Sequence, residues 1–155
     1  MRFLSTGELS GLLRFAADPE KQIEDGRITL TLLEVQQIMG EARLDFEDRE
    51  SEDARRIKRP ARSTAGEESG WWDLGQGVYW VTLRERVEIP QGCAFFLQPH
   101  SRILRNGLWH PTVLIRDWDQ EMDGIMLSVL SRSVRIRENS PVSSGMILHP
   151  GSDRG

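Results

Sequence analysis

Alternation of apolar and polar residues is the strongest pattern in the chain, and it predicts strands. Ile28, Leu30 and Leu32 alternate with threonines after an Asp25-Gly26 turn signal, which is typical of a half-buried strand. Similar segments recur at intervals of roughly ten residues, separated by turn residues. The further predicted strands are 78–83, 86–89, 93–97, 113–115, 125–130, 134–137 and 141–148, with turns at 75–77 and 90–92. This spacing predicts a mainly β fold: a sandwich, a barrel or a jelly roll.

One short helix is predicted near the N-terminus. Ser5 and Glu8 have the spacing of a capping box, and the leucines that follow recur at helical spacing. We therefore expect a helix over about 6–17. It should end before Pro19, because proline disfavours helical backbone in the residue that precedes it.

The pattern changes over 47–70, where charges of both signs crowd together and apolar residues nearly vanish. This composition predicts a charged loop outside the core. Its basic part, 55–62, offers a surface for a phosphate or a nucleic acid. The acidic residues beside it favour a solvated loop instead.

Length and charge narrow the possible functions. A chain of 155 residues can bury one sizeable core, so we expect a single domain over 1–155 with a flexible tail at 149–155. The net charge of −4 lacks the positive field of a nucleic-acid coat, although a local basic pocket would still hold a small nucleotide. No segment approaches the roughly 20 apolar residues of a membrane span. The start of the chain does not resemble a signal peptide, which predicts a cytoplasmic protein without a membrane partner.

Cysteine and histidine offer little chemistry. Cys93 is the sole cysteine, which excludes a disulfide within the chain and is typical of a small buried side chain. His110 and His149 each precede a proline, and we interpret them as structural. The three histidines are too scattered along the chain to indicate a metal site.

The stretch 99–124 contains most of the residues that could bind a ligand or catalyse a reaction. Ser101 lies between His100 and Arg102, and Arg105 follows, so these side chains could together bind anionic oxygens. Asp119 lies in an acidic turn further on, where a carboxylate could hold a water molecule. Structural roles remain open for each: a strand end for Ser101, an ion pair for Arg105 and a solvated acidic turn for Asp119.

Six motifs follow one another along the chain: Q-I-E-D-G-R-I-T-L, L-D-F, W-W-D-L-G-Q-G-V-Y, T-L-R-E-R-V-E-I-P, P-H-S-R-I-L-R-N-G and W-D-Q-E-M-D-G. Together they resemble the dUTPase and dCTP-deaminase superfamily, closest to the archaeal-type dUTPases, from about Gln22 to Leu148. The resemblance implies a dUTPase-like β jelly roll or distorted barrel that forms a homotrimer with active sites between subunits. It also implies hydrolysis of dUTP to dUMP and pyrophosphate, with Mg²⁺ bound through the substrate phosphates.

The resemblance also assigns roles to single residues. It implies that Ser101 binds phosphate oxygens at the cleaved linkage, that Arg105 reaches the triphosphate and that Asp119 holds the attacking water. His100 replaces a family arginine and Arg102 a small residue, and both could still donate hydrogen bonds to a phosphate.

Other family positions differ. Thr29 replaces an aspartate, Ser144 a glutamine, and 120–122 the small residues and aromatic of the acidic turn. These changes leave open a catalytically inactive nucleotide-binding or assembly protein beside the dUTPase-like hydrolase that we favour. Deamination of dCTP is disfavoured, because Val129 stands near the place of the glutamate that the deaminases need.

Overall fold

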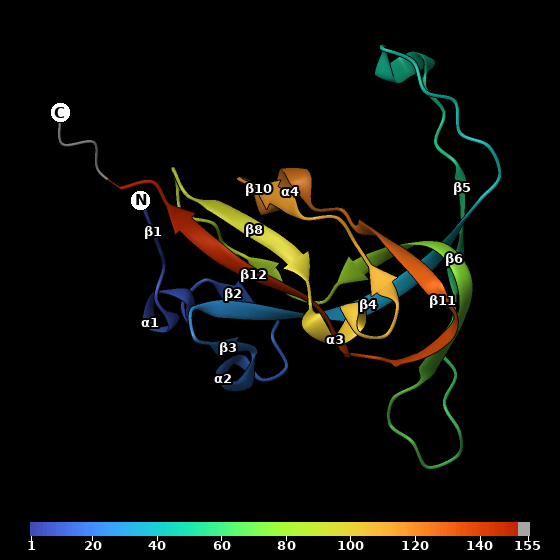
Figure 1. Cartoon of the computed structure of the whole chain (residues 1–155), viewed down its shortest axis with the longest axis horizontal. Coiled ribbons are helices and arrows are strands. Elements are labelled where there is room, and N and C mark those ends of the chain that lie inside the picture. Colours follow the sequence, from blue (N-terminus) through green and yellow to red (C-terminus); the bar gives the residue numbers. More distant parts are fainter. Residues whose placement is uncertain (152–155) are drawn as a thin grey trace.

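The computed structural model describes residues 1–151 and is built mainly from strands (Figure 1). The strands are β1 (Arg2–Phe3), β2 (Leu13–Arg14), β3 (Ile23–Glu24), β4 (Arg27–Met39), β5 (Arg55–Arg59), β6 (Trp71–Leu83), β7 (Arg86–Val87), β8 (Ala94–Pro99), β9 (Leu108–Trp109), β10 (Val113–Ile115), β11 (Ile125–Arg137) and β12 (Pro141–His149). The helices are α1 (Thr6–Leu9), α2 (Pro19–Gln22), α3 (Ser101–Leu104) and α4 (Trp118–Glu121), with a 3₁₀ turn at Asp48–Glu50. Each described helix is too short to cross a membrane.

Antiparallel pairing joins the strands in the order β10-β8-β12-β4-β6-β11-β9, and the sheet curls into a half-barrel. Its inner face carries the core. Ile28, Leu30 and Leu32 of β4 have no exposed surface, as their alternation predicts. Burial of these side chains from water is the main driving force for the curled sheet. The mainly β prediction is confirmed.

The paired strands β6 and β11, of 13 residues each, correct the sequence prediction. The predicted strands 125–130 and 134–137 are one strand, with a register shift between Val129 and Ser133. The predicted turn at 75–77 is also wrong, because Gly75 and Gly77 pair with β11 on either side of that shift. A β-bulge absorbs extra residues within a continuous ladder, and periodicity does not reveal it.

The N-terminal helix is shorter than predicted. The capping box is present, with Ser5 and Glu8 bonded reciprocally, but α1 ends at Leu9. The chain then forms β2, where Leu13 pairs with Val87 of β7. Leu9 and Leu13 are both buried, so the apolar stripe packs in the core without a continuous helix.

The charged segment 47–70 is only partly a loop. Strand β4 continues to Met39, and β5 pairs along its exposed end from Val35 to Met39. The basic run predicted as a loop is therefore an edge strand, because the extended β4 supplies backbone partners. Figure 1 shows the chain between β4 and β5 projecting from the body as an arm. Of the predicted tail, His149 ends β12, and 152–155 lie outside the described residues.

Candidate active site

Helix α3 presents the predicted phosphate-binding residues at the end of β8. His100 caps the helix: its Nδ1 accepts a hydrogen bond from the backbone N–H of Arg102 at 3.1 Å. The backbone N–H of His100 donates to Val142 O of β12 at 3.0 Å, and the buried Ile103 anchors the helix in the core. Ser101 is thereby held at the surface on the first turn.

A cavity of 460 Å³ lies beside this turn, between it and the β3–β4 hairpin. Ser101 and His100 line it from one side, and Arg27 lines it from the other. Thr29 and Ser144 face each other across the β4–β12 pair and line the cavity as well. Two of the positions that differ from the family pattern therefore meet beside Ser101, and both now carry neutral hydroxyl groups.

The environment of His100 keeps its ring neutral. Partial burial lowers its pKa from 6.5, and the positive charges of Arg102 and Arg105 lower it further. In the neutral ring Nδ1 is an acceptor, so the proton is on Nε2. His100 can therefore donate one hydrogen bond to an anionic oxygen without carrying a charge.

Arg102 and Arg105 are both exposed and contribute positive charge to this end of the sheet. Neither has a carboxylate within ion-pair distance among residues 1–151. Their guanidinium groups are thus free to bind an oxyanion, for which a forked donor is well suited. The ion-pair alternative for Arg105 has no support within one copy of the chain.

Asp119 lies elsewhere, on α4. Trp118 is buried against Phe95 with ring centroids 5.9 Å apart, which anchors the helix. The Asp117 side chain caps the helix by accepting from the backbone N–H of Asp119. Glu121 accepts from two backbone N–H groups that precede α4. The two neighbouring carboxylates are therefore engaged locally, whereas that of Asp119 binds a residue outside the helix.

Arg86 holds the carboxylate of Asp119. Its Nη2 donates to Asp119 Oδ2 at 2.5 Å, and both side chains line a second cavity, of 820 Å³. Ser101 does not line this cavity. Within one copy, the structure brings His100 and Ser101 together but leaves Asp119 in a separate cavity.

Three residues in or beside the two cavities were not predicted from the sequence. Arg27 and Arg86 both lie in motifs that carried the family resemblance, but nothing in their spacing indicates a cavity. Glu85 is also buried, and its carboxylate accepts hydrogen bonds from the Thr31 backbone, the Thr31 hydroxyl and the Gln22 amide at 2.6–2.8 Å. This network fixes β4 next to the Ser101 cavity and gives a structural reason for the acidic residue in E-R-V-E-I-P.

The described part of the chain has no group of three or more His, Cys, Asp or Glu side chains that could hold a metal ion. Both cavities carry charges of both signs: Arg27, Glu24 and Asp25 line the cavity beside Ser101, and Arg86 and Asp119 line the other. The exposed guanidinium groups of Arg102 and Arg105 on α3 could bind an anion, and Asp119 in the second cavity supplies an oxygen that could accept a proton.

Comparison with known proteins gives the family. No protein-family model matches the chain. A "Probable deoxyuridine 5'-triphosphate nucleotidohydrolase" of Methanosarcina acetivorans is 30% identical over 153 residues, which cover 92% of this chain and 85% of the relative. The chain belongs to the dUTPase family. Proteins with the same name from Methanosarcina mazei and Methanosarcina barkeri are 31% and 33% identical, over 84% of this chain and 75% of each relative.

A solved structure shares the fold of this chain. The crystal structure of a 2'-deoxycytidine 5'-triphosphate deaminase from Agrobacterium tumefaciens matches with a TM-score of 0.64 and 16% identity over 94% of this chain. This chain spans 46% of the length of that deaminase chain. The likeness shows a shared fold, and the predicted resemblance to the dUTPase and dCTP-deaminase superfamily is confirmed.

Proposed function

We propose that this dUTPase-family protein hydrolyses dUTP to dUMP and pyrophosphate. The observation that carries the proposal is the match to proteins named dUTPase over 92% of the chain. The geometry of α3 supports it, because a serine hydroxyl, a neutral histidine and two free arginines gather at one end of the sheet. A triphosphate carries several negative charges, and positioned donors of this kind are what its hydrolysis requires.

The chemistry assigns a step to each group. Water attacks the α-phosphorus, the bond to the bridging oxygen breaks, and pyrophosphate leaves with the electron pair. Asp119 takes the proton of the attacking water as general base. Ser101 donates to an oxygen at the cleaved linkage, while Arg105, Arg102 and His100 bind oxygens along the triphosphate.

The separation of Asp119 from Ser101 within one copy supports a site shared between copies. A homotrimer, as the family resemblance implies, would place the α3 of one subunit opposite the α4 of its neighbour. The Arg86–Asp119 pair lies at an exposed surface, so a neighbouring subunit can approach it. We therefore propose that the active site forms between subunits.

Magnesium fits this arrangement as a companion of the substrate. Mg²⁺ prefers oxygen ligands and keeps several waters, so phosphate oxygens can hold it with few protein ligands. The cationic groups of α3 would not coordinate it, and Asp119 of a neighbouring subunit would offer one carboxylate. When bound, the ion would neutralise charge on the triphosphate.

Deamination is disfavoured by the residues at the start of β11. Val129 is 1% exposed and apolar, and the segment Ile125–Leu130 contains no titratable side chain. Removal of an amino group needs a general acid or base at that position. A second candidate is a nucleotide-binding protein without catalysis, and the ion pair of Arg86 with Asp119 favours it, because a carboxylate oxygen held by a guanidinium group is less accessible to a water molecule.

Pyrophosphate release from dUTP with Mg²⁺ tests the proposal in wild type and in Asp119→Asn. The variant should lose on the order of 100-fold or more in kcat, since a general base contributes that much. Asp123→Asn, an exposed acidic residue in the same turn, is the matched control and should retain activity. Equal loss in both variants would contradict the role of Asp119, and activity in Asp119→Asn equal to wild type would do so as well.

A further inference from the structure

The arm between β4 and β5 ends in a segment that is both strongly acidic and exposed in its apolar side chains. We call this segment, residues 41–54, the arm tip. It carries seven acidic and two basic side chains, a net charge of −5, whereas the whole chain has −4. The rest of the molecule is therefore slightly positive. At the same time the arm tip exposes two large apolar side chains, Phe46 at 98% and Leu44 at 83%.

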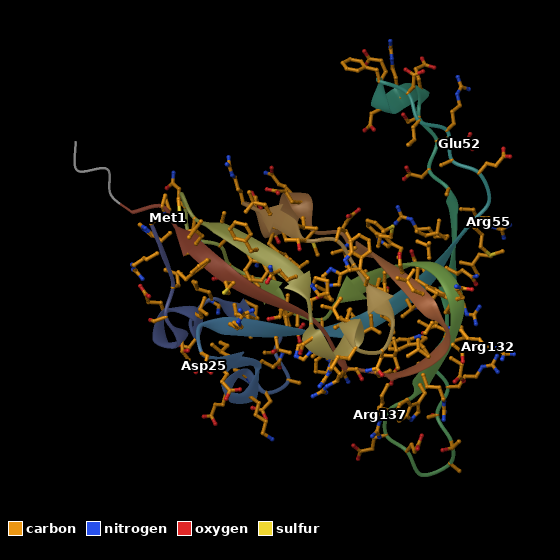
Figure 2. The ribbon with its side chains drawn as sticks, viewed as in Figure 1. Met1, Asp25, Glu52, Arg55, Arg132 and Arg137 are labelled. Atoms are coloured by element: carbon orange, nitrogen blue, oxygen red, sulfur yellow. The ribbon has the colours of Figure 1, made fainter. Side chains whose placement is uncertain are left out.

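The arm tip is an ordered structure and not a frayed loop. Backbone bonds between Arg43 and Glu52 close it at 2.7 and 2.9 Å. The hydroxyl of Ser51 accepts from the N–H of Asp45 at 2.9 Å and lies 3.2 Å from the carbonyl of Glu47. Figure 2 shows Glu52 and Arg55 with their side chains directed to solvent along this arm. Ordering a segment costs conformational entropy, and here no apolar burial within the chain offsets that cost.

A complementary surface lies on α3, β9 and the adjoining turn of β11, which we call the α3–β9 face. Leu104, Trp109 and Leu130 are 50%, 43% and 65% exposed. Trp109 and Leu130 lie on paired strands, β9 and β11. Gly107 connects Leu104 to them, because its N–H donates to Leu104 O at 3.4 Å and its carbonyl accepts from the N–H of Leu130 at 2.8 Å. Arg102, Arg105 and Arg132 add positive charge, and like the first two Arg132 has no ion pair among residues 1–151.

We propose that the arm tip of one copy docks on the α3–β9 face of a second copy of this chain. Phe46 and Leu44 would pack on the three apolar side chains, and the acidic residues would face Arg132, which leaves Arg102 and Arg105 to the triphosphate. Charge complementarity favours this occupant, because the arm tip is acidic and the α3–β9 face is basic. Figure 1 shows the arm projecting away from the body that holds its own α3, which favours a second copy as the occupant.

This inference rests on the self-association part of the proposed function and adds the contact that produces it. Because Arg102 and Arg105 also serve the proposed phosphate site, the docked arm would border the nucleotide. The inference needs no catalysis, so the mass of the chain without nucleotide can test it.

Light scattering after size exclusion gives that mass, against 17.7 kDa for one chain. Wild type should be a multimer. The double variant Leu44→Ser/Phe46→Ser should already dissociate at protein concentrations at least tenfold higher than those at which wild type dissociates. Phe15→Ser, which removes another exposed phenylalanine outside the arm, is the matched control and should keep the wild-type mass. A monomeric wild type would contradict both self-association and the arm contact. A multimer that the arm variants leave intact would contradict the arm contact alone.

Disulfide trapping identifies the acceptor face independently of variant stability. A Phe46→Cys chain mixed with a Leu130→Cys chain should give a mixed disulfide under mild oxidation, while Cys93 is buried and does not compete. Phe46→Cys mixed with Leu33→Cys, at an exposed site on β4, should not. Loss of the multimer in the arm variant without this disulfide would overturn the α3–β9 face as the acceptor.

Discussion

The Glu85 carboxylate shows how one residue holds several elements together. Its three hydrogen bonds tie the end of β6 to β4 and α2. We expect Glu85→Ala to lower the free energy of unfolding by about 2–4 kcal/mol, because it leaves buried donors without an acceptor. Urea unfolding measures this. Glu88→Ala removes an exposed carboxylate nearby and should change stability by less than about 1 kcal/mol; an equal effect of both variants would refute the role of the buried network.

His110 makes stability depend on pH. It is 1% exposed, its Nε2 lies 2.8 Å from the Ser143 hydroxyl, and burial lowers its pKa below 6.5. Below pH 6.5 the unfolded chain binds a proton that the folded chain does not, so stability falls as the pH falls toward the folded pKa. Between pH 8 and 5.5 we expect wild type to lose more unfolding free energy than His110→Gln, measured with urea. A loss of the same size in both proteins would show that His110 is not the titrating group.

For single residues, the sequence indicated which side chains matter better than it indicated which partners they contact. His110 was interpreted as structural, and the structure buries it with two hydrogen-bonding neighbours. Ser101 and His100 were predicted to act together, and they share a cavity. The pairing of Asp119 with Arg86 joins residues 33 positions apart, and no local pattern reveals such a contact.

At the scale of elements, the turn after α3 depends on Gly107. Its φ is 78°, and a Cβ there would lie 2.9 Å from the Cβ of Ser131. We expect Gly107→Ala to lower the unfolding free energy by about 1–3 kcal/mol, from backbone strain and overpacking. Gly75→Ala is the control, because Gly75 has open space and no left-handed φ. Thermal unfolding of both variants checks this, and a Gly107→Ala protein as stable as Gly75→Ala would contradict the requirement for glycine.

Strands could be predicted from alternation, whereas their lengths could not. β10 was predicted with its correct bounds, because three apolar residues lie between polar ones. β11 was divided in two, because the consecutive polar residues Ser131, Arg132 and Ser133 lie at its bulge and have the composition of a turn. The segment 47–70 was predicted as a loop, and β5 within it was missed, because its partner β4 continues to Met39 through residues that alternate poorly. The predicted length of the N-terminal helix was wrong for a related reason. β2 pairs with β7, and this tertiary pairing overrides the local helical spacing.

At the scale of the whole molecule, we expect each active site to be formed by a pair of subunits. Asp119→Asn and Ser101→Ala chains should each be inactive alone. After the two are mixed and subunits exchange, sites that combine an intact Asp119 with an intact Ser101 from another copy should recover about a quarter of the wild-type rate, as random pairing dictates. Pyrophosphate release measures the recovery. An inactive mixture, with subunit exchange demonstrated, would contradict a shared site.

Cleavage of dUTP by this dUTPase-family chain can be measured directly. The assay follows the products that wild type forms from dUTP and, separately, from dCTP, with Mg²⁺ present. We expect dUMP and pyrophosphate in equal amounts from dUTP, and no ammonia from dCTP. Unchanged dUTP in a folded and assembled sample would contradict the hydrolase and favour a nucleotide-binding protein, and ammonia from dCTP would contradict the conclusion drawn from Val129.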